Sequence, residues 1–222
     1  MSLSGEPIKL SEDQQVQADV IYALLAQQTG SEPDSRLKQS LSQVWFGSSY
    51  VQQKCHRYPE IFVELVQSGL LWRAYEADEL GKQICSILIS DLVSNEVELM
   101  TQLRLIRTRE MIRIIWRDLA GWSDLAETMR ELSELADACV DAALTVLYKW
   151  NIEKLGTPFD KDGNQQHLVV LGMGKLGGHE LNLSSDIDLI FAYPEEGETL
   201  NKNNKSITNH EFFQKLGQQL IN

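Results

Sequence analysis

The sequence predicts a mainly helical α+β protein, with an N-terminal helical bundle followed by an incomplete α/β unit. Apolar residues recur every three or four positions from about Ser11 to Leu155, which is the period of an amphipathic helix. The pattern then changes to short, β-branched apolar runs between turn residues, which is typical of buried strands. We therefore expect a bundle over residues 1–155, a linker over 156–166 and the α/β unit over 167–222.

The helices of the bundle have recognisable ends. A segment over residues 59–72 begins with Pro59, a residue suited to the first helical position. A second segment, over 107–121, ends at Gly121, which is a natural C-terminal stop. The clearest helix follows Ser123, the expected N-cap. Its apolar face comprises Leu125, Met129, Leu132, Ala136, Cys139, Ala143, Leu147 and Trp150.

The α/β unit follows a turn-rich linker and alternates short strands with loops. We predict strands over 167–172 and 187–193, then a polar loop over 194–206. Thr208 and Glu211 form a capping box ahead of an amphipathic helix. This unit is shorter than a finished domain, so we expect a truncated domain.

Composition excludes several classes of protein. The net charge of −12, from 32 acidic and 20 basic residues, makes a nucleic-acid partner unexpected, because binding a polyanion needs clustered Lys and Arg. No apolar run approaches the ~18 residues that cross a bilayer, and the polar N-terminus does not resemble a secretory signal. We therefore expect no membrane association. Three widely spaced cysteines indicate buried apolar side chains in a reducing compartment, so we expect a cytoplasmic location.

The glycines after the first predicted strand allow two interpretations. Gly172, Gly174 and Gly177 match G-x-G-x-x-G, the pattern of a dinucleotide-binding turn. In that motif the third glycine opens a full crossover helix that returns a parallel strand, which needs a dozen or more residues. Only seven residues, 179–185, separate Gly178 from Asp186, so the spacing argues against a dinucleotide site.

Asp186 and Asp188 favour a metal site instead. In a strand, residues two apart point to the same side, so both carboxylates would lie together while Ile187 and Leu189 enter the core. Such a pair repels unless a cation lies between them, and Mg²⁺ prefers oxygen ligands and substrate phosphates. The pair Gly177–Gly178 is expected to expose N–H groups at the N-terminus of a short helix, as a phosphate cradle. Together these features indicate metal-assisted phosphoryl transfer; a solvated strand edge is the alternative for two such aspartates alone.

Arg109, Arg113 and Arg117 place three like charges on one helix face. In so acidic a chain we expect salt bridges within the molecule. Docking of a partner or of the catalytic unit is the alternative.

The stretch GMGKLGGHELNLSSDIDLIFAY, residues 172–193, resembles the signature of bacterial glutamine synthetase adenylyltransferase/deadenylylase, a family of polymerase-β-like nucleotidyltransferases. In that superfamily a glycine pair precedes an Asp-x-Asp by roughly ten residues, as Gly177–Gly178 precedes Asp186 and Asp188 here. The helical text before this stretch is similar to the region that precedes the family's first catalytic domain. The resemblance runs from about Trp45 to Tyr193.

The resemblance implies a bifunctional regulator of glutamine synthetase. Its N-terminal domain removes AMP from a tyrosine of glutamine synthetase by phosphorolysis, giving ADP, and its C-terminal domain attaches AMP from ATP. Asp186 and Asp188 would be the catalytic Mg²⁺ ligands, and Gly177 and Gly178 would bind nucleotide or phosphate. Lys175 and Ser185 flank them as further candidates for nucleotide binding.

The superfamily also needs a third carboxylate on a later strand, which this chain does not contain, so we expect the chain to be inactive alone. The expected partners are glutamine synthetase, a PII-type signal protein, nucleotide (ATP, ADP or AMP) and phosphate. Two alternatives remain open. One is a non-catalytic module that docks glutamine synthetase or PII, and the other is a nucleotidyltransferase acting on a nucleotide, an antibiotic or an RNA end.

Overall fold

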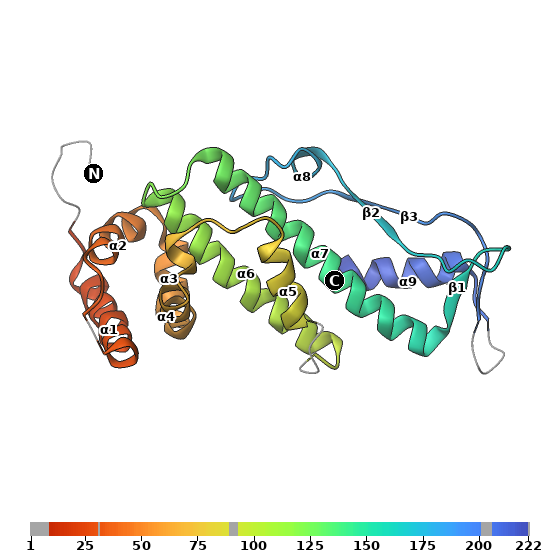
Figure 1. Cartoon of the computed structure of the whole chain (residues 1–222), viewed down its shortest axis with the longest axis horizontal. Coiled ribbons are helices and arrows are strands. Elements are labelled where there is room, and N and C mark those ends of the chain that lie inside the picture. Colours follow the sequence, from red (N-terminus) through yellow and green to blue (C-terminus); the bar gives the residue numbers. More distant parts are fainter. Residues whose placement is uncertain (1–8, 31, 89–92, 201–205, 222) are drawn as a thin grey trace. The chain divides into compact units, whose positions relative to one another are not determined.

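The structure is a computed structural model that describes residues 9–30, 32–88, 93–200 and 206–221. These residues are mainly helical with a small antiparallel β region, as the sequence predicted (Figure 1). In chain order the elements are α1 Glu12–Thr29, α2 Ser35–Gly47, α3 Ser49–Arg57, α4 Pro59–Gln67, η1 Leu70–Trp72, α5 Glu79–Leu88, α6 Glu96–Leu119, α7 Leu125–Leu155, β1 Thr157–Phe159, β2 Val169–Gly172, α8 Gly174–Gly177, β3 Leu189–Ala192, β4 Glu198–Leu200 and α9 Asn209–Ile221.

The chain forms two compact units. Unit 1 comprises Met1–Ala77 and Arg104–Leu132, and unit 2 comprises Asp78–Leu103 and Ser133–Asn222. The long helices α6 and α7 therefore contribute residues to both units. The predicted boundaries after residues 155 and 166 stay a prediction.

The core of unit 1 is built around aromatic side chains. Trp116 of α6 is fully buried, and its ring lies 4.6 Å from that of Phe62 in α4. The indole N–H of Trp116 donates to Ser40 Oγ at 3.0 Å, so its one polar atom is satisfied inside the core. All five tryptophans of the chain are buried or half-buried, and they are Trp45, Trp72, Trp116, Trp122 and Trp150.

Arg109, Arg113 and Arg117 of α6 all form ion pairs within unit 1, which confirms the prediction of internal salt bridges. Arg113 is completely buried and binds both carboxylate oxygens of Glu131, at 2.7 and 3.1 Å. Its guanidinium also donates to the carbonyl oxygens of Leu70 and Arg73. The other two pairs are Arg109 with Glu64, at 2.8 Å, and Arg117 with Glu127, at 2.6 Å. The network links α4, the segment around η1, α6 and the start of α7.

The predicted helix ends at Pro59 and Gly121 agree with the structure, whereas α6 begins at Glu96 and not at residue 107. Gly121, at φ 70°, follows α6 in the left-handed region that glycine adopts without a Cβ clash. Its N–H and that of Trp122 donate back to the carbonyls of Asp118 and Arg117, which closes the helix. The predicted N-cap Ser123 is wrong by one residue, because Asp124 Oδ1 accepts from the N–H of Glu127. The segment that begins at Pro59 is not one helix to Trp72, because α4 ends at Gln67 and η1 follows.

Within its described residues, unit 2 contains two separate two-stranded antiparallel sheets. In one, β2 pairs with β3, and Gly172 lies opposite Leu189. In the other, β1 pairs with β4, with Thr157 opposite Leu200. The second sheet corrects two expectations: β1 lies in the predicted linker and β4 in the predicted polar loop, of which residues 201–205 are outside the described chain. Each of these strands has only three residues, and Pro158 occupies the middle of β1.

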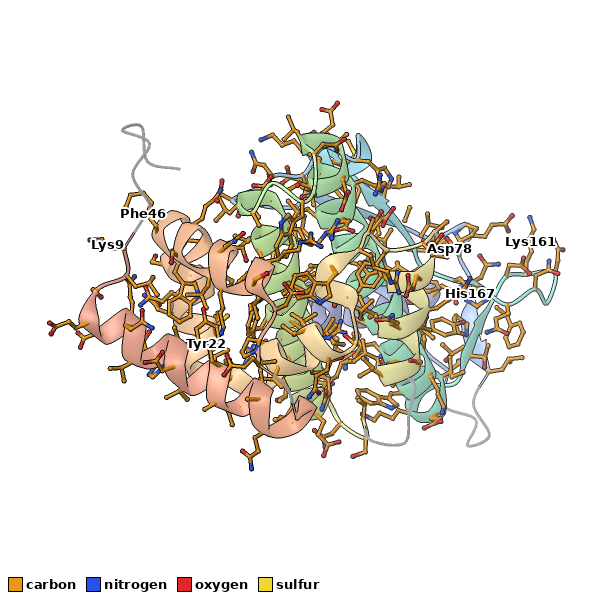
Figure 2. All side chains as sticks on the ribbon, turned by 60° about the vertical axis from the view of Figure 1, so that its left-hand side comes forward. Lys9, Tyr22, Phe46, Asp78, Lys161 and His167 are labelled. Atoms are coloured by element: carbon orange, nitrogen blue, oxygen red, sulfur yellow. The ribbon has the colours of Figure 1, made fainter. Side chains whose placement is uncertain are left out.

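Helix α9 begins with the predicted capping box. The N–H of Thr208 donates to Glu211 Oε2 at 3.1 Å, and the N–H of Glu211 donates to Thr208 Oγ1 at 3.2 Å. The buried face of α9 carries Phe212 and Phe213. Phe212 meets the ring of Tyr148 on α7 edge-on at 5.8 Å, and Tyr148 also lies beside the ring of His167. Figure 2 labels His167, which lies two residues before β2. These contacts pack α9 and the start of β2 against the C-terminal part of α7.

The remaining compositional expectations concern cysteines and membranes. The three cysteines are free; Cys55 is buried and the other two are half-buried. Burial raises the pKa of the Cys55 thiol, as expected for an apolar, unreactive role. Within the described residues, no helix has the length and apolar character needed to cross a membrane.

Candidate functional site

The glycine turn connects β2 to the four-residue helix α8. Gly177 lies so close to β2 that a Cβ on it would be 2.5 Å from the carbonyl oxygen of Gly172. A side chain at position 177 would therefore push α8 away from the strand. The glycine at this position serves the close approach of two backbone segments.

The predicted phosphate cradle at Gly177–Gly178 is placed differently in the structure. These two glycines lie at the C-terminal end of α8, whereas the helix begins at Gly174. Their N–H groups donate to the carbonyls of Met173 and Gly174, so neither is presented at a helix N-terminus. The expectation failed because the chain enters the helix three residues earlier, at Gly174, which adopts φ 56°.

Asp186 and Asp188 lie next to this turn, immediately before β3. The pairing of β2 with β3 continues for one more hydrogen bond, in which the N–H of Met173 donates to the carbonyl of Asp188 at 2.9 Å. The structure thus brings the aspartates and the glycine turn together at one end of the β2–β3 pair. Both aspartates are exposed.

Two details of the predicted aspartate strand are wrong. The strand begins at Leu189 rather than Ile187, so neither aspartate belongs to it. Ile187 is 40% exposed and does not enter the core, while Leu189 is half-buried. Strand alternation therefore does not fix the two carboxylates on one side. The antiparallel pairing also excludes the dinucleotide interpretation, which needs a parallel strand after the glycine motif.

Lys175 and Ser185 occupy opposite ends of the segment that joins the turn to the aspartates. Lys175 is exposed on α8. Ser185 Oγ donates to Asn182 Oδ1 at 2.6 Å and accepts from the N–H of Asn182 at 3.2 Å. The hydroxyl of Ser185 therefore stabilises a local turn one residue before Asp186.

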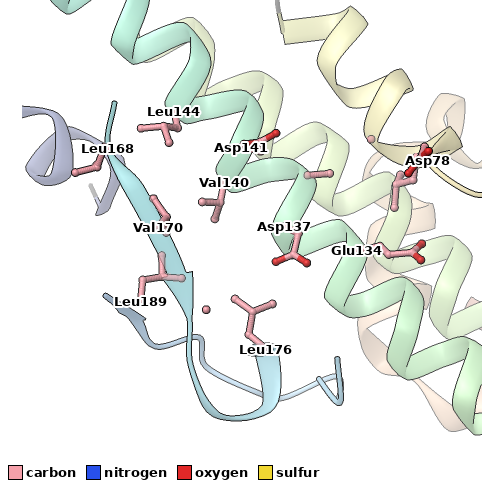
Figure 3. Close-up of a pocket in the computed structure, with 14 residues that line it drawn as sticks. Asp78, Glu134, Asp137, Val140, Asp141, Leu144, Leu168, Val170, Leu176 and Leu189 are labelled. Atoms are coloured by element: carbon pink, nitrogen blue, oxygen red, sulfur yellow. The ribbon is translucent and has the colours of Figure 1, made fainter. Parts of the chain in front are cut away.

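A cavity of about 410 Å³ lies beside the glycine turn, within unit 2. Leucine and valine side chains from α7, α8, β2 and β3 form its apolar lining (Figure 3). Four acidic residues also line it, and they are Asp78, Glu134, Asp137 and Asp141. Burial raises the pKa of Asp137, while His179, whose Nε2 lies 3.8 Å from Asp137 Oδ2, opposes that shift.

The donor set near the turn suits a hard cation. Two exposed carboxylates two residues apart provide oxygen ligands, and Mg²⁺ is commonly bound by one or two carboxylates together with substrate phosphates. Among the described residues, no three His, Cys, Asp or Glu side chains come close enough to form a complete metal site. Asp186 and Asp188 therefore fit a site that substrate oxygens complete.

The sequence interpretation missed the contacts between α7 and the segment after the turn. The N–H of Leu181 donates to Ser133 Oγ, and His179 faces Asp137. Ser133 and Asp137 are one helical turn apart, which is visible in the sequence. Nothing in the sequence, however, connects them with a loop more than 40 residues later.

Comparison with known proteins identifies the relatives of the chain. A family model described as glutamate-ammonia ligase adenylyltransferase matches residues 38–222. The bifunctional glutamine synthetase adenylyltransferase/adenylyl-removing enzyme of Nitrosococcus oceani is 50% identical over 183 residues, which are 82% of this chain and 19% of the relative. Enzymes of the same description from Thioalkalivibrio sulfidiphilus and Pseudomonas putida are 44% and 46% identical, covering 82% and 83% of this chain and 18% and 19% of their own lengths. The chain thus spans about a fifth of the length of these relatives.

Proposed function

The chain belongs to the glutamate-ammonia ligase adenylyltransferase family, and from that premise we propose that it contributes the AMP-removing site of a bifunctional regulator of glutamine synthetase. The observation that carries the proposal is the juxtaposition of Asp186 and Asp188 with the glycine turn at one end of the β2–β3 pair. The family supplies the chemistry of adenylyl transfer, and the names of the relatives supply glutamine synthetase as the protein acted on.

In the proposed reaction, an oxygen of inorganic phosphate attacks the phosphorus of the tyrosine-bound AMP. A new P–O bond forms, the bond from phosphorus to the tyrosine oxygen breaks, and ADP leaves while the tyrosine oxygen takes up a proton. A magnesium ion bound beside the glycine turn would orient the phosphates and neutralise their developing charge. Asp186 and Asp188 would bind it. Gly177 and Gly178 have no side chains and would leave room for nucleotide or phosphate beside the turn, although their N–H groups are paired within it. Lys175 and Ser185 would flank the same site.

We place the catalytic part within residues 167–222, after a bundle over 1–155 and a linker over 156–166. The other partners are a PII-type signal protein, nucleotide and phosphate, and the location is the cytoplasm. Because the described residues hold no third acidic ligand beside Asp186 and Asp188, we predict metal binding without turnover by the 222 residues alone.

The first test is Mn²⁺ binding, followed by electron paramagnetic resonance, because Mn²⁺ replaces Mg²⁺ at oxygen sites. We expect the wild-type chain to bind Mn²⁺ and Asp186→Ala to lose it. Asp162→Ala is the matched control, since Asp162 is an exposed aspartate in the turn between β1 and β2. In parallel, ADP release is measured with adenylylated glutamine synthetase, Mg²⁺ and phosphate.

The outcomes separate the alternatives. Mn²⁺ binding that depends on Asp186 but not on Asp162 supports the metal site, and ADP release would contradict only the prediction of inactivity. Absence of Mn²⁺ binding, together with retained binding to glutamine synthetase, would favour the non-catalytic docking module. The observation that favours the docking module as a second candidate function is the lack of a third acidic ligand among the described residues.

A further inference from the structure

Between the glycine turn and the hydrogen bond that joins Asp188 to Met173, the segment that carries the two aspartates packs on the rest of unit 2 through one buried side chain. From Gly178 to Asp188, Leu181 is the buried residue, with 4% of its surface exposed, and Ser185 is half-buried. All the other residues of this segment are exposed. The path of the segment between these two points therefore depends on how Leu181 is held.

Leu181 is held by α7 through its backbone as well as its side chain. The N–H of Leu181 donates to Ser133 Oγ at 3.3 Å, and Ser133 is completely buried. One turn further along the same face of α7, Asp137 lies 3.8 Å from the imidazole of His179. Ser133 and Asp137, on one face of α7, thus contact two loop residues, Leu181 and His179, that are two positions apart.

The chemistry of Ser133 fits this contact better than a packing role. A serine hydroxyl can accept the hydrogen bond of a buried N–H, which the methyl group of alanine at the same position could not do. The N–H of Leu181 would in turn be a buried donor without an acceptor if the hydroxyl were absent. His179 adds local constraint, because it adopts φ 54°, a conformation that non-glycine residues rarely take without support from their surroundings.

We propose that Ser133 is a positioning residue whose hydroxyl, by accepting from the N–H of Leu181, places the loop that presents Asp186 and Asp188. The effect of this loop placement on metal binding rests on the proposed function. The placement itself does not rest on the proposed function, so the role of Ser133 and the metal site can fail separately.

The test compares Ser133→Ala with two variants. Ser133→Thr keeps the hydroxyl and should restore the wild-type behaviour. Thr145→Ala removes another α7 hydroxyl, whose bond is to the carbonyl of Asp141 in its own helix, and should change neither readout. Hydrogen exchange of the amides of residues 181–188 measures loop placement without metal, and Mn²⁺ titration measures its effect on the aspartates.

For Ser133→Ala we expect faster exchange at Leu181 and across the loop, with exchange in α9 unchanged. We also expect Mn²⁺ affinity to fall by about 2- to 10-fold, which is the range for loss of one hydrogen bond. Unchanged loop exchange would overturn the proposal, and so would faster exchange with unchanged Mn²⁺ affinity. If the wild type binds no Mn²⁺, the proposed metal site fails, and the exchange data alone decide whether Ser133 places the loop.

Discussion

At the scale of single residues, Gly177 shows how closely the turn is built. A Cβ at this position would clash with the backbone of Gly172, whereas a Cβ at Gly178 would find its nearest neighbour at 3.6 Å. We predict that Gly177→Ala lowers the free energy of unfolding by about 1–3 kcal/mol, as overpacking does. Gly178→Ala should change it by less than about 0.5 kcal/mol. Urea unfolding of both variants checks this, and equal effects would show that the close approach is unimportant.

The second prediction at the residue scale concerns the ion pair of Arg113 with Glu131, because both of its side chains are buried. Arg113→Met leaves the carboxylate of Glu131 uncompensated, and we expect the free energy of unfolding to fall by about 3–5 kcal/mol. The double variant Arg113→Met with Glu131→Leu should recover part of that loss. Lys38→Met, which removes an exposed pair with Glu32, is the control and should have no measurable effect. A mild effect of Arg113→Met would contradict the interpretation of the network.

At the scale of elements, the capping box of α9 makes stability depend on pH. The N–H and hydroxyl of Thr208 hold the pKa of Glu211 below its usual value. A pKa lowered by folding gives a contribution that is present above the unfolded pKa of about 4.3 and is lost as pH falls through the folded value. We therefore predict that amide protection in the first turn of α9 decreases between about pH 5 and pH 3. In Glu211→Gln this pH dependence should disappear; if it persists, another group is responsible.

Also at the scale of elements, the helix ends were more predictable from the sequence than the short strands. Helix ends fixed by local chemistry, such as Pro59, Gly121 and the Thr208 capping box, agree with the structure. The strands β1 and β4 were missed because each has three residues and exists through pairing with a partner about 40 residues away. Such pairing leaves no periodic pattern, and a proline in β1 argues locally against a strand.

The candidate site was predictable in its composition but not in its local geometry. The sequence identified the glycine turn and the two aspartates, and the structure brings them together. It did not reveal that α8 begins at Gly174, that the aspartates precede β3, or that Ser133 contacts Leu181. Those features depend on where the chain leaves β2 and on contacts with α7, which no short-range pattern encodes.

At the scale of the whole molecule, the net charge of −12 predicts weak interaction with polyanions. Nucleic-acid binding requires basic groups that release counterions from phosphates, and here the acidic residues outnumber the basic ones. We expect no retention on heparin and no shift of double-stranded DNA in gels at about 150 mM salt. Retention that decreases steeply with added salt would reveal a local basic surface and would reopen the nucleic-acid alternative.

The pairing of β2 with β3 also has a consequence for how the protein folds. The glycine turn and both aspartates lie between two strands that are consecutive in the sequence and antiparallel, so this region is a long hairpin. The entropy lost on closing such a loop rises only slowly with its length, and local contacts of this kind form quickly. The groups proposed to bind the metal can therefore assemble from one continuous stretch of chain, before the distant pairing of β1 with β4 is complete.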